Sequence, residues 1–228
     1  RDSIVEMLSV CSMIMMHLSR FSEEILLWSS WEFKFIELSN NFTTGSSIMP
    51  QKKNSDMAEL VRGKTGRVYG NLMGFLTTLK GLPLAYNKDL QEDKEYVFDS
   101  IDTVKLCLEV FAPMLSEMKV NSEKMLQAGK EGFINATDLA DYLVKKGMPF
   151  RSAYKLVGGI VQKCINENKT LDTLTIEEYK AIDSIFEKDL YDSISLINCV
   201  NNRISKGGTS VKEVEKQIKA IKILLQNL

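Results

Sequence analysis

The hydrophobic pattern at the start of the chain is that of a long helix. Between Asp2 and Ser29 there is no proline or glycine, and apolar residues recur every three or four positions. This spacing predicts one α-helix over residues 2–29. Apolar side chains also lie outside the stripe that this repeat forms, for example at Val10 and Met13. A helix that is apolar around much of its circumference is typical of a bundle or a subunit interface.

A second long helix is predicted over residues 55–80. Its apolar positions repeat with helical spacing, but four glycines cluster on one side of it: Gly63, Gly66, Gly70 and Gly74. Each glycine inside a helix costs about 1 kcal/mol relative to alanine. Because glycine lacks a Cβ, such a face predicts that another backbone or a substrate approaches closely there.

A third helix is predicted over residues 95–118, where apolar residues alternate by four and three as in a bundle seam. Pro113 should kink this helix or end it early. Beyond residue 119 the predicted helices are shorter, and no segment is predicted to be a strand. We therefore predict an all-α chain: a long-helix bundle segment, residues 1–122, followed by a small all-helical C-terminal domain, residues 123–228.

The shorter helices have recognisable ends. One is predicted over residues 137–146, closed by a glycine and a proline, and another over residues 150–166. The pairs Thr175–Glu178 and Ser210–Glu213 have the spacing of a capping box. Helices should therefore begin directly after both pairs' hydroxyl residues.

Charge and hydropathy narrow the functional classes. Lys and Arg number 29 against 30 Asp and Glu, for a formal net charge of −1 and a pI near 6.0. This balance argues against a large binding surface for nucleic acid or anionic lipid. The apolar run Val10–Leu18 is too short and too polar to span a bilayer. We expect no nucleic-acid or membrane partner and, with no signal peptide, a cytoplasmic protein.

Other candidate sites give weak signals. The four cysteines are far apart without a CxxC pair, so reduced thiols are expected rather than a structural zinc site. His17 lies inside the first apolar helix, and we interpret it as a packed or hydrogen-bonded structural residue. Residues 63–65, Gly-Lys-Thr, match the end of a phosphate-binding loop motif. The required earlier glycine is missing and the segment lies within a predicted helix, so we do not predict a phosphate-binding loop there.

The segment 43–54, TTGSSIMPQKKN, is dense in turn-forming residues and predicts an ordered loop. It brings together two hydroxyls, two ammonium groups and an amide, which can bind carboxylates and stabilise negative charge developing beside a carbonyl. A serine could act as a base here only if its alkoxide were stabilised by the lysines or by backbone N–H groups. Composition alone also fits a solvated Ser-Lys turn.

Residues 45–54, GSSIMPQKKN, closely resemble the signature loop of the fumarase/aspartase superfamily, homotetrameric lyases that eliminate fumarate from a succinyl substrate. QKKN followed by MAELVRGKTGRVYGNLMG is similar to the argininosuccinate lyase family, as are LPLAYNKDLQEDKE from Leu82 and ATDLADYLVKKGMPFRSAY from Ala136. The resemblance covers essentially the whole chain, but only about the C-terminal half of a full-length member. Ser55 stands where the family usually has proline, which should loosen the helix start and leave the chemistry alone.

The resemblance implies roles for residues of the signature loop. Ser46 matches the catalytic base that removes the Cβ proton, and Ser47 is the less favoured candidate. Lys52 and Asn54 match residues that hold a substrate carboxylate and stabilise the dianion formed on proton loss. Glu59 matches an acid that orients a catalytic histidine, and that histidine belongs to the N-terminal half of the family.

It also implies a substrate. Tyr86, Gln91 and Lys94 match positions that contact the arginine-derived end of the substrate, and Lys94, as a cation, should meet a carboxylate. The implied reaction cleaves argininosuccinate to arginine and fumarate, the last step of arginine biosynthesis, without a metal or cofactor.

The implied assembly is a homotetramer in which long helices form a central bundle, and residues 1–122 would be the C-terminal part of that bundle. Active sites would combine loops of three subunits, so the 228-residue chain alone should have little or no activity. Two alternatives stay open: a non-catalytic structural or oligomerisation role, as in lens crystallins of this fold, and a sister lyase acting on another succinyl substrate.

Overall fold

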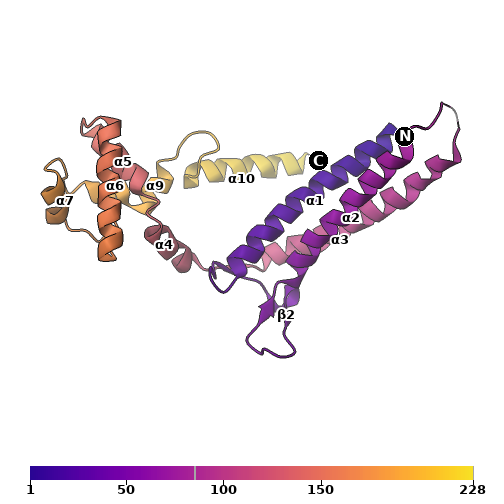
Figure 1. The fold of residues 1–228 in the computed structure, drawn as a ribbon, viewed down its shortest axis with the longest axis horizontal. Helices are drawn as coiled ribbons and strands as arrows, with labels where there is room; N and C mark the ends of the chain where they lie inside the picture. The colour runs from indigo at the N-terminus through magenta and orange to yellow at the C-terminus, as the bar shows by residue number, and fades with distance from the viewer. Residues whose placement is uncertain (85, 228) are drawn as a thin grey trace. The chain divides into compact units, whose positions relative to one another are not determined.

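The computed structural model describes residues 1–84 and 86–227 and divides into two compact units, Arg1–Lys124 and Met125–Leu228 (Figure 1). Both units are built mainly from helices, and the expected all-α class is confirmed.

Three long helices make up most of the first unit: α1 (Asp2–Ser29), α2 (Asp56–Leu79) and α3 (Asp93–Ser116). They confirm the three long helices predicted from the apolar pattern. Figure 1 shows them side by side, with α2 running antiparallel to α1 and α3. α3 continues for one turn beyond Pro113 before it ends.

The core of this unit lies along the seam between the three helices. Its fully buried side chains include Leu8 and Met15 of α1, Val68 and Phe75 of α2, and Met114 of α3. Burial of each such side chain contributes roughly 1.5–3 kcal/mol. Polar bonds also join the helices here: the Thr65 hydroxyl of α2 donates to the Met15 carbonyl oxygen of α1 at 3.2 Å, and the Asn71 amide of α2 donates to the buried Ser100 hydroxyl of α3 at 3.0 Å.

By length and hydropathy α1 as a whole could cross a membrane, although the run Val10–Leu18 alone is too short. The core helix of a globular protein can have the same composition. Leu8 and Met15 of α1 are fully buried in the bundle. We therefore interpret α1 as a bundle helix.

The glycine face of α2 is largely open in this chain. A Cβ on Gly74 would lie 2.7 Å from Cε1 of Tyr96, so α3 does approach closely there. A Cβ on Gly63, Gly66 or Gly70 would meet no described atom within 4 Å. Gly74 therefore has a close neighbour, but it is the side chain of Tyr96 and not another backbone as predicted.

The chain also contains two antiparallel pairs of two-residue strands: β1 (Ile36–Glu37) with β4 (Lys119–Val120), and β2 (Thr44–Gly45) with β3 (Lys53–Asn54). Two short 3₁₀ helices, η1 (Asn40–Phe42) and η2 (Lys88–Glu92), lie in the connections. The sequence did not predict these strands because two residues are too few to show the alternation of a strand.

The second unit contains shorter helices, the first of which begins three residues before the unit does: α4 (Ser122–Glu131), α5 (Ala136–Lys145), α6 (Phe150–Glu167), α7 (Ile176–Ile182), α8 (Leu190–Ile194), α9 (Leu196–Asn201) and α10 (Val211–Gln226). Leu143, Tyr179 and Phe186 are fully buried in its core.

Both predicted capping pairs lie where helices begin. Thr175 and Glu178 form the complete capping box, with both reciprocal bonds present. The Ser210 hydroxyl accepts a bond from the Glu213 N–H, while the Glu213 carboxylate pairs with Lys216.

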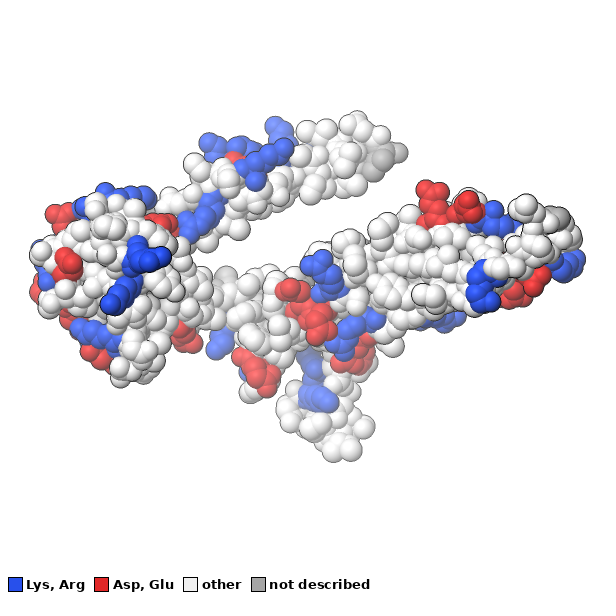
Figure 2. Space-filling view, turned by 45° about the horizontal axis from the view of Figure 1, so that its top comes forward, with Lys and Arg blue, Asp and Glu red and all other residues white. Residues whose placement is uncertain are grey.

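Charged side chains of both signs are interspersed over the visible surface, as expected for a net charge near zero (Figure 2). Some form geometrically good pairs, such as the two 3.0 Å bonds from the Arg203 guanidinium to the Asp138 carboxylate. Fully exposed pairs contribute at most about 1 kcal/mol each, whereas in this pair the Asp138 carboxylate is buried.

Candidate active site

The signature loop is a hairpin that projects from one end of the three-helix bundle (Figure 1). Its root is the β2–β3 pair, in which Thr44 lies opposite Asn54 and Gly45 opposite Lys53. The Thr44 hydroxyl also donates a hydrogen bond to the carboxylate of Asp56, at the start of α2. The first strand is therefore held to the helix that follows the loop.

Ser46 follows β2 directly and is half-buried. Its Oγ accepts hydrogen bonds from the backbone N–H of Ile48 at 3.2 Å and of Met49 at 3.0 Å. Two N–H donors aimed at one oxygen stabilise negative charge on it. These are the donors that a serine alkoxide requires, so the loop has the local geometry that a serine base needs.

The two lysines of the loop have different environments. The Lys53 ammonium donates to the Glu37 carboxylate of β1 at 2.9 Å, and this bond lowers the pKa of Glu37. The Lys52 side chain is exposed, and the backbone N–H of this residue donates to the Met49 carbonyl oxygen. Within residues 1–84 and 86–227 the structure thus pairs Lys53, and not Lys52, with a carboxylate.

The remaining predicted residues near the loop are Asn54, Ser47 and Glu59. Asn54 is half-buried on β3, Ser47 is exposed beside Ser46, and Glu59 is exposed in the first turn of α2. His17, which we predicted to be packed, is exposed instead. That prediction was wrong because the buried stripe of α1 passes through positions 15 and 18 and leaves 17 outside.

The residues expected at the arginine end of the substrate lie elsewhere. Tyr86 and Gln91 are exposed between α2 and α3, and Lys94 is in the first turn of α3. They are at the end of α2 opposite the signature loop (Figure 1). α2 has 24 residues, which at 1.5 Å per residue corresponds to about 36 Å. One chain does not bring the two sets of predicted residues together.

Sequence reasoning missed several residues that support these side chains. Glu37 binds Lys53, Asp93 binds Lys94 at 3.1 Å, and the Ser29 and Ser55 hydroxyls lie 3.1 Å apart at the root of the loop. The first and third pairs join segments far apart in the sequence, and no local motif signals them. The Asp93–Lys94 pair was visible only as two neighbouring charges.

The cysteines have the features of buried thiols. All four are buried and unpaired, and burial raises the pKa of Cys11, Cys107 and Cys164 and raises that of Cys199 to about 12. Among the described residues, no group of three or more His, Cys, Asp or Glu side chains is arranged to hold a metal ion.

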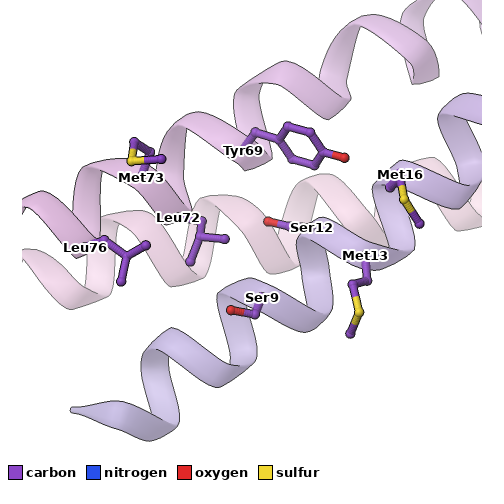
Figure 3. A pocket seen from close by; sticks show the side chains of 8 residues that line it. All are labelled: Ser9, Ser12, Met13, Met16, Tyr69, Leu72, Met73 and Leu76. Carbon is purple, nitrogen blue, oxygen red and sulfur yellow. The ribbon is translucent and has the colours of Figure 1, made fainter.

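An apolar groove of about 400 Å³ runs between α1 and α2 (Figure 3). Met13, Tyr69 and Met73 line it and are 56%, 45% and 64% exposed. The Ser12 hydroxyl, which also lines it, is buried and has no hydrogen-bond partner among the described residues. A buried hydroxyl without a partner is costly, and the exposed methionine and tyrosine side chains give this face an apolar surface.

Comparison with known proteins gives two matching family models. The model described as "Argininosuccinate lyase C-terminal" matches residues 133–201, and the model described as "Lyase" matches residues 1–70. Among curated proteins, the argininosuccinate lyase of Clostridium beijerinckii is 60% identical over 97% of this chain and 48% of its own length. That of Desulforamulus reducens is 57% identical over 100% of this chain and 50% of its own.

Solved structures agree. EDDS lyase in complex with formate has a TM-score of 0.83 at 25% identity, over 100% of this chain and 47% of that chain. Class II fumarase from Schistosoma mansoni has a TM-score of 0.69 at 20% identity, over 85% and 38%, which shows a shared fold. The chain spans about half the length of the curated relatives it matches. It belongs to the argininosuccinate lyase family of the fumarase/aspartase superfamily and corresponds to the C-terminal half of a family member.

Proposed function

We propose that the full-length protein cleaves argininosuccinate into arginine and fumarate, with Ser46 as the base. The observation that carries this proposal is the pair of backbone N–H donors on the Ser46 Oγ. A proton next to a carboxylate is very weakly acidic, because its loss places two negative charges on one group. Donors arranged in advance lower this barrier, and removing one such donor typically costs about 10²–10³ in rate.

The steps balance as an elimination. The Ser46 alkoxide takes a proton from Cβ of the succinyl group, and the C–H electron pair moves into the adjacent carboxylate. Lys52 and Asn54 stabilise the resulting dianion. The electron pair then returns to form the double bond of fumarate as the C–N bond breaks. The leaving guanidino nitrogen takes a proton from an acid that the N-terminal half supplies.

Each active site, in this proposal, combines segments of different subunits of a homotetramer. The separation of about 36 Å along α2 supports this arrangement, because the signature loop and Lys94 of one chain lie at opposite ends of a 24-residue helix. The open glycine face and the apolar groove of Figure 3 are surfaces that neighbouring subunits would cover.

We also infer that the protein acts in the cytoplasm, without a nucleic-acid or membrane partner. Four buried, unpaired cysteines support a reducing compartment. The formal net charge of −1 argues against a strongly basic surface for nucleic acid.

The test is turnover of argininosuccinate by the full-length protein, followed by the ultraviolet absorbance of fumarate. Ser46→Ala should lower kcat by about 10²–10⁴-fold, as expected for loss of a catalytic base, and leave the oligomer intact on size exclusion. Ser47→Ala is the matched control and should stay near wild type. Full activity of Ser46→Ala would place the base elsewhere. Preference for adenylosuccinate, aspartate or malate would point to a sister lyase instead.

A further inference from the structure

Glu37 is an exposed carboxylate on β1, outside the signature loop, to which the sequence pattern assigns no role. The residues on either side of it, Ile36 and Leu38, are 5% and 3% exposed and belong to the core of the three-helix bundle. β1 also pairs with β4, which places Glu37 opposite Lys119. Because successive side chains of a strand point to opposite faces, burial of its neighbours holds the Glu37 carboxylate at a fixed place on the surface.

The signature loop has no such anchor in the core. None of residues 44–53, all of which the structure describes, is buried, and Ile48 is 87% exposed. A segment with few buried apolar contacts opens locally at low cost in free energy. The position of the hairpin therefore depends on its polar contacts.

Polar side-chain contacts join the hairpin to its surroundings. The Thr44 hydroxyl binds Asp56, which lies two residues beyond the end of β3. The Lys53 ammonium reaches a different segment, because its Nζ donates to Oε1 of Glu37 at 2.9 Å. The two side chains of this pair are 46% and 65% exposed. The bond from Lys53 and its charge, and then the charge of Lys119, lower the pKa of Glu37, so the carboxylate is ionised at neutral pH.

The Lys53 contact also decides which way the neighbouring side chains face. Adjacent side chains of a strand lie on opposite faces, so Asn54 points away from the face on which Lys53 meets Glu37. Lys52 directly precedes β3, and the same alternation, continued by one residue, places it with Asn54. These are the two residues that the proposed function needs beside one substrate carboxylate.

We propose that Glu37 is a positioning residue. By holding Lys53 on one face of the hairpin, it directs Lys52 and Asn54 to the opposite face, toward a carboxylate of the substrate. This inference rests on the proposed function, in which these two residues stabilise the dianion formed on proton loss. Contacts that strengthen in the transition state lower kcat when they are lost. Misplacement of the hairpin should therefore lower kcat more than it raises KM.

The test exchanges the two charges of the pair in the full-length enzyme. Glu37→Lys brings a third ammonium group to Lys53 and Lys119 and should lower kcat for argininosuccinate about tenfold. Lys53→Glu should do the same, because it leaves two carboxylates together. The double variant Glu37→Lys with Lys53→Glu restores an opposite pair and should recover kcat to within about threefold of wild type. Glu37→Gln keeps an acceptor oxygen and should lower kcat only about two- to fivefold.

Glu23→Gln is the matched control. The Glu23 carboxylate is 66% exposed and pairs with Arg62 at 2.6 Å between α1 and α2, so this variant loses a comparable ion pair outside the hairpin. Its kcat should match wild type. Melting temperatures of all variants should stay within about 4 °C of wild type, because an exposed pair contributes little to stability. The inference is overturned by an unchanged kcat in Glu37→Lys, by no recovery in the double variant, or by a loss of kcat that follows a larger fall in melting temperature.

The two proposals fail differently. A wild-type protein that does not cleave argininosuccinate overturns the proposed function, and the role of Glu37 with it. A wild-type enzyme that does cleave it, with an unimpaired Glu37→Lys variant, overturns only the role of Glu37.

Discussion

Two inactive variants of this enzyme should restore each other's activity if its active sites combine different subunits. Ser46 lies in the hairpin that precedes the N-terminal end of α2, and Lys94 lies in the first turn of α3, which follows the C-terminal end of α2. The 24 residues of α2 separate them by about 36 Å. A substrate the size of argininosuccinate cannot contact both side chains of one chain, so the proposed site would take Ser46 from one subunit and Lys94 from another.

The magnitude follows from random assembly. When Ser46→Ala and Lys94→Ala full-length chains are co-expressed in equal amounts, half of the signature loops and half of the 94 positions are intact. A site that draws these residues independently from two subunits is intact in roughly one quarter of cases. Fumarate production should recover to about that fraction of wild-type activity, while each variant alone is strongly impaired.

A second mixture controls for stabilisation by co-expression. Ser46 and Lys52 belong to the same loop, so Ser46→Ala mixed with Lys52→Ala leaves every loop with one defect. This mixture should stay inactive. Recovery in the control, or none in the Ser46→Ala and Lys94→Ala mixture, would refute the assignment of these residues to different subunits.

Two further predictions concern titrating groups of the second unit. A hydrogen bond from Lys169, then one from the Thr175 N–H, lowers the pKa of Glu178 to about 2. The Glu178 carboxylate therefore stabilises the fold above its unfolded pKa of about 4.3, and this stabilisation is lost as the pH falls toward 2. The melting temperature of Glu178→Gln should depend less on pH over this range than that of the wild type. Burial raises the pKa of Cys199 to about 12, so a thiol-specific reagent at pH 8 should label it only after denaturation. Labelling of the native thiol as fast as a free thiol would contradict that burial.

The long helices were predictable because the apolar repeat that indicates a helix lies within a continuous stretch of the sequence. The repeat of apolar residues predicted α1 with both of its ends, and α2 and α3 to within two residues. The strand pairs were not predictable in this way. β1 and β4 join residues 36–37 to residues 119–120, and such pairing leaves no periodic trace in two residues.

The candidate site shows the same division between local and distant information. The residue types of the signature loop indicated that a serine base would need backbone donors, and the structure supplies them from Ile48 and Met49. Which lysine is engaged depends on Glu37, a residue of another segment, so the sequence could not distinguish Lys52 from Lys53 by their contacts. The resemblance favoured Lys52, the one whose ammonium the structure leaves outside a carboxylate pair.

The glycines of α2 link the stability of one helix to the assembly of subunits. Gly70 lowers the stability of the helix by about 1 kcal/mol relative to alanine, yet no described atom lies within 4 Å of the place where its Cβ would be. Gly70→Ala should therefore stabilise the 228-residue chain by about 0.5–1 kcal/mol, as should Gly158→Ala on α6, which is equally open. In the full-length protein, Gly70→Leu should reduce the assembled fraction on size exclusion, because a neighbouring helix could no longer approach. Unchanged assembly of Gly70→Leu would mean that this face is not a subunit contact, and the glycines would then lack a compensating interaction.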